Sequence, residues 1–241
     1  MGGNVFMPKR LSKKRNSNSN NTLFTTKSIV PLTYNQEKTF TEYTINNKNL
    51  VLHGMAGTGK TFCALYLGLK DVIDNSNDIH KLYIIRSAVP TRDLGFLPGT
   101  LKEKIKQYES PYKSVCAEIF SRGDAYDILK SKDMVEFMST SFIRGETYDN
   151  CVLFIDEMQN LTFHELDSVI TRAGENTRLI FSGDFKQSDL ARNHDRHGLL
   201  DFMKILDKMK EDFSKIQFDI DDVVRSGLVK SYLLAKDKFF T

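Results

Sequence analysis

Short apolar runs alternate with longer amphipathic segments from about residue 49 onward. The apolar runs have the length of buried strands, and the amphipathic segments have the spacing of helices with one apolar face. This alternation predicts an α/β fold, in which helices cover both faces of a parallel sheet. Such a sheet binds ligands at the carboxyl ends of its strands. The predicted strands are 49–53, 81–86, 134–139, 151–155, 178–182 and 216–219, and the predicted helices are 61–72, segments within 100–130, 162–173 and 198–210.

A glycine-rich segment lies between the first predicted strand and the first predicted helix. It matches G-x-x-x-x-G-K-[ST] at every position, with Gly54, Met55, Ala56, Gly57, Thr58, Gly59, Lys60 and Thr61. The glycines let successive backbone N–H groups surround anionic oxygens, and the helix adds its positive N-terminal end. Lys60 is expected to reach the β- and γ-phosphates of a nucleotide, and the Thr61 hydroxyl to bind Mg²⁺. A chance glycine-rich turn is the alternative, but it does not account for the complete pattern.

Two acidic residues, Asp156 and Glu157, follow the most apolar predicted strand, 151–155. Asp156 is placed to hold Mg²⁺ through a water molecule, opposite Thr61. Glu157 is the candidate base that orients and polarises the attacking water. A solvated acid pair at a strand end is the alternative, but the phosphate loop makes a catalytic role the better interpretation. The two carboxylates favour hydrolysis over transfer to a small-molecule acceptor.

The order of the motifs favours one branch of the phosphate-loop proteins. At least one further predicted strand separates Thr61 from Asp156, whereas simple nucleotide kinases and GTPases usually place the acidic strand closer to the loop. This arrangement is typical of the additional-strand branch, which ATP-driven motors use. The guanine-binding pattern Asn-Lys-x-Asp is absent, since residues 47–50 fail it at the fourth position. We therefore expect ATP as the nucleotide.

The strand predicted at 178–182 runs into the sequence Ser-Gly-Asp-Phe-Lys-Gln at 182–187. We expect this strand to lie beside the acidic strand, so that Asp184 and Gln187 emerge near the terminal phosphate. Gln187 can donate a hydrogen bond to a γ-phosphate oxygen and accept one from the attacking water, which makes it a candidate sensor. A helix-capping turn is the alternative interpretation of this segment.

Charge is distributed unevenly along the chain. The sequence has 34 basic and 31 acidic residues and a net charge of +3, yet no acidic residue occurs within 1–36. We therefore divide the chain into a basic, Asn- and Ser-rich tail at 1–30, expected to be disordered, and a slightly acidic domain at 31–241. The tail is a solubilising leader or, alternatively, a weak electrostatic arm for nucleic acid.

The composition argues against both a membrane protein and a disulfide-rich secreted protein. No apolar run approaches the length of a transmembrane helix, and the N-terminus lacks the apolar stretch of a secretory signal. Cys63, Cys116 and Cys151 lie far apart without metal-ligand spacing, which indicates free thiols in a reducing compartment. We expect a cytoplasmic protein without a membrane partner.

Together these motifs resemble those of the PhoH-like proteins, the phosphate-starvation-inducible ATPases of bacteria and their phages. The resemblance covers roughly 31–235 and rests on several blocks in one order. Ser87 and Met158 depart from the residues usual in the family, Pro and Ala, which bears on packing rather than on chemistry. Besides the phosphate loop, the blocks are RSAV at 86–89, LGFLPG at 94–99, FIRG at 142–145, DEMQN at 156–160, SGDFKQSDL at 182–190 and DVVR at 222–225.

The resemblance implies a three-layer, RecA-like core similar to the first motor domain of superfamily 1 helicases, with ATP and Mg²⁺ as ligands. In those helicases a glutamine upstream of the phosphate loop contacts the adenine edge, and Gln36 matches that position. An exposed polar residue at a helix start is the alternative for Gln36. In this fold an arginine from a second domain or subunit usually completes the ATP site. Arg225 is the first candidate because a family block contains it, and Arg86 and Arg144 follow, although a surface ion pair is the alternative for each.

A single core leaves no room for a second motor domain in this chain. We therefore expect either a homo-oligomer, in the form of a head-to-tail ring, or a slow ATPase. The sequence thus predicts a Mg²⁺-dependent ATPase of the PhoH-like type. Two alternatives stay open: hydrolysis could drive the remodelling of RNA or single-stranded nucleic acid, or the protein could be a nucleotide-dependent switch with little turnover.

Overall fold

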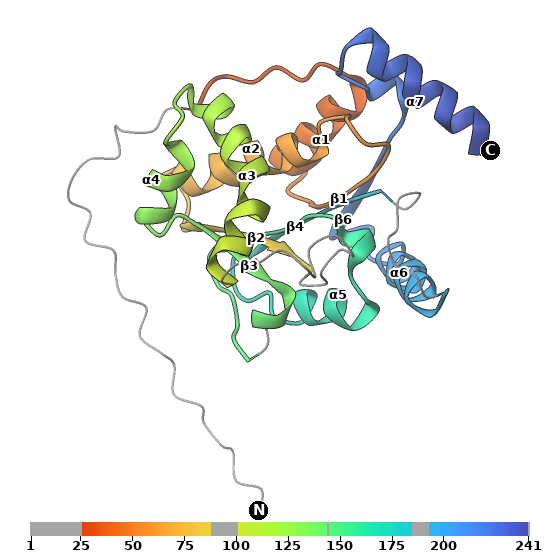
Figure 1. Cartoon of the computed structure of the whole chain (residues 1–241). Coiled ribbons are helices and arrows are strands. Elements are labelled where there is room, and N and C mark those ends of the chain that lie inside the picture. The colour runs from red at the N-terminus through yellow and green to blue at the C-terminus, as the bar shows by residue number, and fades with distance from the viewer. Residues whose placement is uncertain (1–25, 88–100, 144, 185–192, 241) are drawn as a thin grey trace, which may run out of the picture.

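The computed structural model describes residues 26–87, 101–143, 145–184 and 193–240. Its centre is a six-stranded, parallel sheet with the strand order β3-β2-β4-β5-β1-β6 (Figure 1). All of the predicted strands are confirmed, although the last begins at Phe213 rather than at 216, because polar side chains interrupt its apolar pattern. The strands are β1 (Asn49–Gly54), β2 (Lys81–Arg86), β3 (Val135–Ser139), β4 (Cys151–Ile155), β5 (Arg178–Gly183) and β6 (Phe213–Phe218).

Helices cover both faces of the sheet, as the sequence predicts (Figure 1). Successive side chains of β1 show why: Leu50 and Leu52 belong to the core on one face, and Val51 belongs to the core on the other. The first face is covered by α1 (Tyr34–Thr44), α2 (Lys60–Ile73), α3 (Leu101–Phe120) and α4 (Ala125–Ser131), and the second by α5 (Phe163–Ile170) and α6 (Asn193–Leu206).

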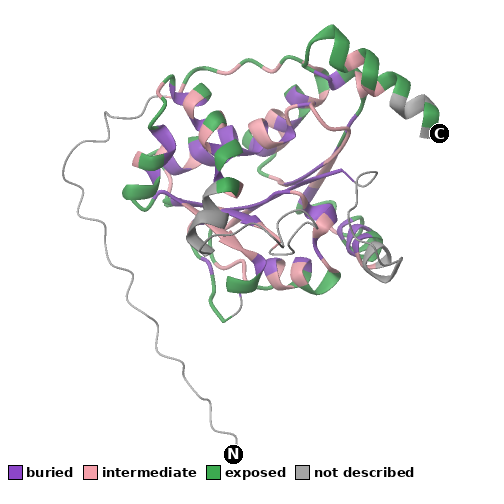
Figure 2. Ribbon diagram, in the orientation of Figure 1, coloured by how far each residue is buried: buried purple, intermediate pink, exposed green. Residues whose placement is uncertain are grey.

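α5, α6 and the C-terminal helix differ from the sequence prediction, and α1 lies before the first predicted helix. α5 ends at Ile170 rather than at 173, because the N–H groups of Arg172 and Ala173 bond three residues back in a tighter turn. α6 begins and ends earlier than 198–210. α7 (Gly227–Phe240) is not predicted, and it leaves apolar side chains such as Leu228 and Phe239 exposed while it contacts the short helix η5 (Ile220–Asp222) (Figure 2). Within the described ranges, none of the helices combines the length and the apolar character needed to cross a membrane.

The described residues just before α1 lie against the domain. The Lys27 N–H donates to the Ile119 carbonyl of α3 at 3.0 Å, and Ile29 packs against the core on the same face of the sheet. The last residues of the segment assigned to the tail therefore contact the domain. The remainder of that segment, 1–25, lies outside the described residues.

The sheet brings the candidate motifs together at one edge. β5 pairs with β4 on one side and with β1 on the other, so it is inserted between the phosphate-loop strand and the acidic strand. This confirms that the strand before Asp184 lies beside the acidic strand. Because the strands are parallel, the phosphate loop, the pair Asp156 and Glu157, and Asp184 all follow carboxyl ends at the same edge.

Candidate active site

The phosphate loop leaves β1 through glycines whose backbone conformations other residues rarely adopt. Gly54, Gly57 and Gly59 have φ values of +116°, +79° and +85°, and Gly59 is the N-cap of α2. The Met55 N–H donates to the Phe218 carbonyl at the end of β6 at 3.1 Å, which fixes the start of the loop. A loop of this kind at a helix N-terminus lets consecutive N–H groups converge on an anion.

The Lys60 side chain lies along the phosphate loop and is 8% exposed. Its ammonium donates to the carbonyl oxygens of Gly54 at 2.8 Å and Met55 at 2.6 Å. Burial lowers the pKa of Lys60, whereas the nearby carboxylates of Asp184 and Glu157 act to raise it. An ammonium group held by loop carbonyls in this way can exchange them for phosphate oxygens.

Thr61 and Asp156, which the sequence predicts to hold Mg²⁺, lie together. The Thr61 hydroxyl donates to Asp156 Oδ1 at 3.3 Å, and Asp156 is buried. Burial raises the pKa of Asp156 and the charge of Glu157 raises it further, while Arg86 acts in the opposite direction. The carboxylate therefore lies in a site where an added positive charge would be favoured.

The donor set fits Mg²⁺ that arrives with a nucleotide. A hydroxyl and a carboxylate oxygen are hard ligands, and Mg²⁺ is usually held by one or two carboxylates together with substrate phosphates. Among the residues that the structure describes, no group of three or more His, Cys, Asp or Glu side chains could hold a metal ion. The described residues therefore do not form a complete metal site by themselves, and Mg²⁺ would need phosphate oxygens as further ligands.

Glu157 follows Asp156 with φ of +54° and ψ of 43°, a left-handed conformation that is uncommon for a residue other than glycine. Its carboxylate accepts a hydrogen bond from the Gln159 amide, and Gln159 Oε1 accepts one from the Asp184 N–H at 3.0 Å. Gln159 thus links the ends of β4 and β5 and restrains the Glu157 side chain. No role of Gln159 is predicted from the sequence, although the residue lies in the family block at 156–160.

Gln36 is buried against the phosphate loop, so the alternative of an exposed polar residue is wrong. Its amide donates to the Thr58 carbonyl at 3.1 Å, and its Oε1 accepts from the Leu32 N–H at 2.9 Å. The side chain therefore joins the start of α1 to the loop. Contact between Gln36 and adenine stays a prediction.

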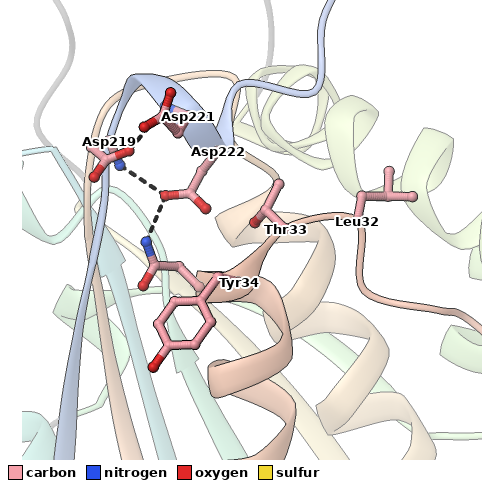
Figure 3. Close-up of a pocket in the computed structure, with 7 residues that line it drawn as sticks. Leu32, Thr33, Tyr34, Asp219, Asp221 and Asp222 are labelled. Carbon is pink, nitrogen blue, oxygen red and sulfur yellow. Dashed lines mark hydrogen bonds between the residues drawn. The ribbon is translucent and has the colours of Figure 1, made fainter.

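A pocket of about 320 Å³ opens between the start of α1 and the turn that contains η5 (Figure 3). The Asp222 carboxylate accepts from the Asn35 amide at 2.7 Å and from the Asp219 N–H at 3.0 Å, so it ties the two walls together. Tyr34 lies at the pocket with 75% of its surface exposed. The lining residues are Leu32, Thr33, Tyr34, Asn35, Asp219, Asp221 and Asp222.

The segment after η5 carries Arg225 onto the phosphate loop of its own chain. The Val224 N–H donates to the Gly57 carbonyl at 3.3 Å. The Arg225 side chain passes so close to Gly57 that a Cβ atom there would lie 3.3 Å from Arg225 Cγ and 4.0 Å from Nε. The first candidate for the completing arginine therefore lies beside the loop within a single chain, a contact that the family block alone does not reveal.

Arg86, at the end of β2, lies near the acid pair. Burial acts to lower its pKa, but Tyr112, Asp156 and Glu157 raise it overall. Tyr112, on α3, donates its hydroxyl to Asp156 Oδ2 at 2.9 Å, and nothing in the sequence marks it among the nine tyrosines. The remaining predicted residues, Arg144 and Gln187, lie outside the described residues, so their roles stay predictions.

Comparison with known proteins gives a match over most of the chain. The family model described as PhoH-like protein matches residues 28–236. The PhoH-like protein of Bacillus subtilis (strain 168) is 33% identical over 186 residues, which are 77% of this chain and 57% of the relative. Protein PhoH of Escherichia coli (strain K12) is 32% identical over 196 residues, which are 79% of this chain and 54% of the relative. The chain thus spans about half the length of these relatives.

Solved structures share the architecture. The large terminase from a thermophilic bacteriophage, in complex with ATP-gamma-S, has a TM-score of 0.52 at 15% identity, covering 84% of this chain and 49% of that chain. At this identity the likeness establishes the fold alone, a RecA-like P-loop NTPase core, which confirms the predicted fold class. With the phosphate loop, the acidic strand and a family match over most of its length, the chain belongs to the PhoH-like protein family.

Proposed function

We propose that this protein is a Mg²⁺-dependent ATP hydrolase. One observation carries the proposal: the phosphate loop lies opposite the acidic strand end, with Thr61 Oγ1 and Asp156 Oδ1 3.3 Å apart and Glu157 directly after Asp156 in sequence. Membership of the PhoH-like family supports a nucleotide ligand. The thermophilic phage terminase, which shares the fold, was solved with ATP-gamma-S, and this gives further support.

Each side chain has a separate task in the proposed reaction. Lys60 exchanges its loop carbonyls for phosphate oxygens and offsets their charge. Thr61 and Asp156 hold Mg²⁺, which supplies positive charge where negative charge develops on the phosphate oxygens. Glu157 accepts the proton of the attacking water as a general base, and the Gln159 amide keeps its carboxylate in place.

The adenine base is proposed to enter the pocket between α1 and η5. The pocket lies next to Gln36, whose amide already bonds to the phosphate loop. A nucleotide with its phosphates in the loop could therefore extend its base past Gln36 into the pocket. Tyr34 offers an exposed aromatic ring on which a base can stack. The exposed carboxylate of Asp221 can accept a hydrogen bond from an exocyclic amino group, which adenine carries.

We expect the protein to release phosphate from ATP in the presence of Mg²⁺ and to lose this activity in EDTA. Lys60→Ala should lower the turnover at least about a hundredfold, because the charge that develops on the phosphate is then left without its ammonium partner. Lys38→Ala removes an exposed lysine of α1 and is the control. Nucleotide binding without phosphate release would support a nucleotide-dependent switch instead, and the absence of both would contradict the proposal.

Arg225 is proposed to complete the ATP site. Its position beside Gly57 supports a role within its own chain, whereas an arginine from a second copy would require the head-to-tail ring expected from the sequence. The mass of the protein in solution, with and without a nonhydrolysable ATP analogue, separates the two arrangements. A monomer in both states supports the role within one chain, and a nucleotide-dependent ring supports an arginine from the neighbour.

ATP hydrolysis is further proposed to be coupled to RNA or single-stranded nucleic acid. The support is the basic N-terminal segment and the resemblance to helicase motor domains. RNA should then stimulate ATP turnover, and deletion of 1–25 should reduce the stimulation while keeping the Lys27 and Ile29 contacts. The assay adds RNA to the ATPase reaction at low and high salt, because phosphate contacts weaken as salt rises. An absence of stimulation by any polynucleotide would contradict this coupling.

A cytoplasmic location is proposed from the state of the cysteines. Cys63, Cys116 and Cys151 are all free and buried. Burial raises the pKa of Cys63 and Cys116 to about 12 and that of Cys151 to about 11, so the thiols stay protonated and unreactive at neutral pH. Such cysteines are typical of proteins in a reducing compartment.

A further inference from the structure

We propose that Tyr112 is a positioning residue that fixes which oxygen of Asp156 faces the Mg²⁺ site. This inference rests on the proposed function, since it concerns how the proposed Mg²⁺ ligand is oriented. Tyr112 lies on α3 and is fully buried. It bonds to one carboxylate oxygen of Asp156, and Thr61 bonds to the other. Among the hydrogen bonds of the described residues, the Tyr112 hydroxyl has none to the phosphate loop.

The two oxygens of Asp156 have different partners. The Tyr112 hydroxyl donates to Oδ2 at 2.9 Å, and the Thr61 hydroxyl donates to Oδ1 at 3.3 Å. The shorter bond occupies Oδ2 and stops the carboxylate from rotating about its last torsion. Oδ1 is thereby kept on the side of the phosphate loop, where it can bind Mg²⁺ directly or through water.

The Tyr112 ring is itself held by two strands. It packs edge-on against Phe154 of β4, with ring centroids 6.5 Å apart, and in a tilted arrangement against Phe137 of β3, with centroids 5.9 Å apart. Phe154 belongs to β4, and Asp156 directly follows this strand. The Tyr112 hydroxyl and the Asp156 carboxylate are therefore both held in place by β4. The geometry therefore restrains Asp156 before any nucleotide binds.

Arg86 provides a second restraint from the same side. Its guanidinium lies over the ring of Tyr108, 5.7 Å from the ring centroid, and Tyr108 is one helical turn before Tyr112 on α3. α3 thus holds a hydroxyl against Asp156 and an aromatic face beneath the arginine. This arrangement places a positive charge near the acid pair without using the phosphate loop.

Tyr112→Phe keeps the ring packing and removes only the hydroxyl. A matched control exists in Tyr126→Phe: Tyr126 lies on α4 in the same core, is also buried, and donates its hydroxyl to Glu109 Oε1 at 3.1 Å. Both variants lose one buried hydrogen bond from a tyrosine to a carboxylate, so both thermal unfolding midpoints should fall. The fall should be larger for Tyr112→Phe, because its hydroxyl also interacts with Arg86. Only the first variant alters a bond to the proposed Mg²⁺ ligand.

The test measures binding of a fluorescent ATP analogue in EDTA and across a titration with Mg²⁺. In the wild type, Mg²⁺ should tighten binding with a defined midpoint concentration. Tyr112→Phe should raise this midpoint about tenfold, the lower end of what loss of a group that orients a metal ligand costs. Its dissociation constant in EDTA should equal that of the wild type, and Tyr126→Phe should match the wild type in both measurements.

Each other result overturns the inference in a recognisable way. An unchanged Mg²⁺ midpoint in Tyr112→Phe shows that the hydroxyl does not position Asp156. Equal weakening in EDTA and in Mg²⁺ shows that Tyr112 supports the loop as a whole rather than the Mg²⁺ ligand. A wild-type protein that binds the analogue with no effect of Mg²⁺, or does not bind it, contradicts the proposed function, and the role of Tyr112 fails with it.

Discussion

Replacing Glu157 with glutamine is expected to lower ATP turnover at least about a hundredfold, the usual contribution of a general base, while ATP binding is retained. Glutamine keeps the size of the side chain and still presents an oxygen to the Gln159 amide, which now donates to Glu157 Oε2. The left-handed backbone at 157 is equally accessible to both residues. The substitution therefore removes proton acceptance with little change in geometry.

Two measurements on the Glu157→Gln variant separate chemistry from binding. Phosphate release in a single turnover reports the chemical step, and titration with a fluorescent ATP analogue reports affinity. Glu118→Gln, which neutralises an exposed glutamate of α3, is the control for the loss of one negative charge. If Glu157→Gln hydrolysed ATP at the wild-type rate, the base would have to lie elsewhere, and the Asp184 carboxylate at the end of β5 would be the next candidate.

The parts of this fold that follow from sequence are those set by local patterns. β4 is predicted correctly at both ends because its run of apolar residues is bounded by polar ones and is buried on both faces. The phosphate loop is predictable because its backbone conformation requires glycine. Gly59, the N-cap of α2, has φ of +85°, which residues with a side chain rarely adopt. The adjacency of Asp156 and Thr61 then follows from the rule that parallel strands end at one edge.

The contacts that the sequence does not reveal join residues far apart in the chain. Tyr112 lies 44 positions before Asp156, and its hydroxyl has no sequence pattern that distinguishes it from other core tyrosines. Arg225 reaches Gly57 only because β6 pairs with β1 and returns the chain to the loop. Such contacts depend on the packing of completed elements, which a pattern of apolar and polar residues does not specify.

α7 shows a different limit. Leu228 and Tyr232 lie one helical turn apart but are exposed, so apolar side chains at a spacing that usually indicates a buried face lie on the surface here. Apolar and polar side chains are mixed around α7, so its amphipathic pattern is weak. Propensity and local hydrogen bonds then decide the structure, and these are poorer predictors than burial.

Gly54→Ala should lower the free energy of unfolding by at least about 3 kcal/mol, because a backbone penalty and a steric clash act together. Gly54 has φ of +116°, and a Cβ atom there would lie 2.0 Å from the carbonyl oxygen of Phe218. That oxygen accepts the Met55 N–H at 3.1 Å. Relief of the clash must therefore move β6 away from the bond that fixes the start of the phosphate loop, and ATP affinity should fall together with stability.

Gly145→Ala separates the two contributions. Gly145 also has a positive φ, +97°, but a Cβ atom there would meet nothing within 4 Å. Urea unfolding should therefore show only the backbone penalty, about 1–2 kcal/mol, with ATP affinity unchanged. If Gly54→Ala cost no more than Gly145→Ala, the Phe218 carbonyl would be free to shift, and the pairing of β6 with β1 could not be what holds the phosphate loop. A larger loss of stability at Gly54, together with a lower ATP affinity, would show that the contact with Phe218 of β6 holds the phosphate loop in its binding conformation.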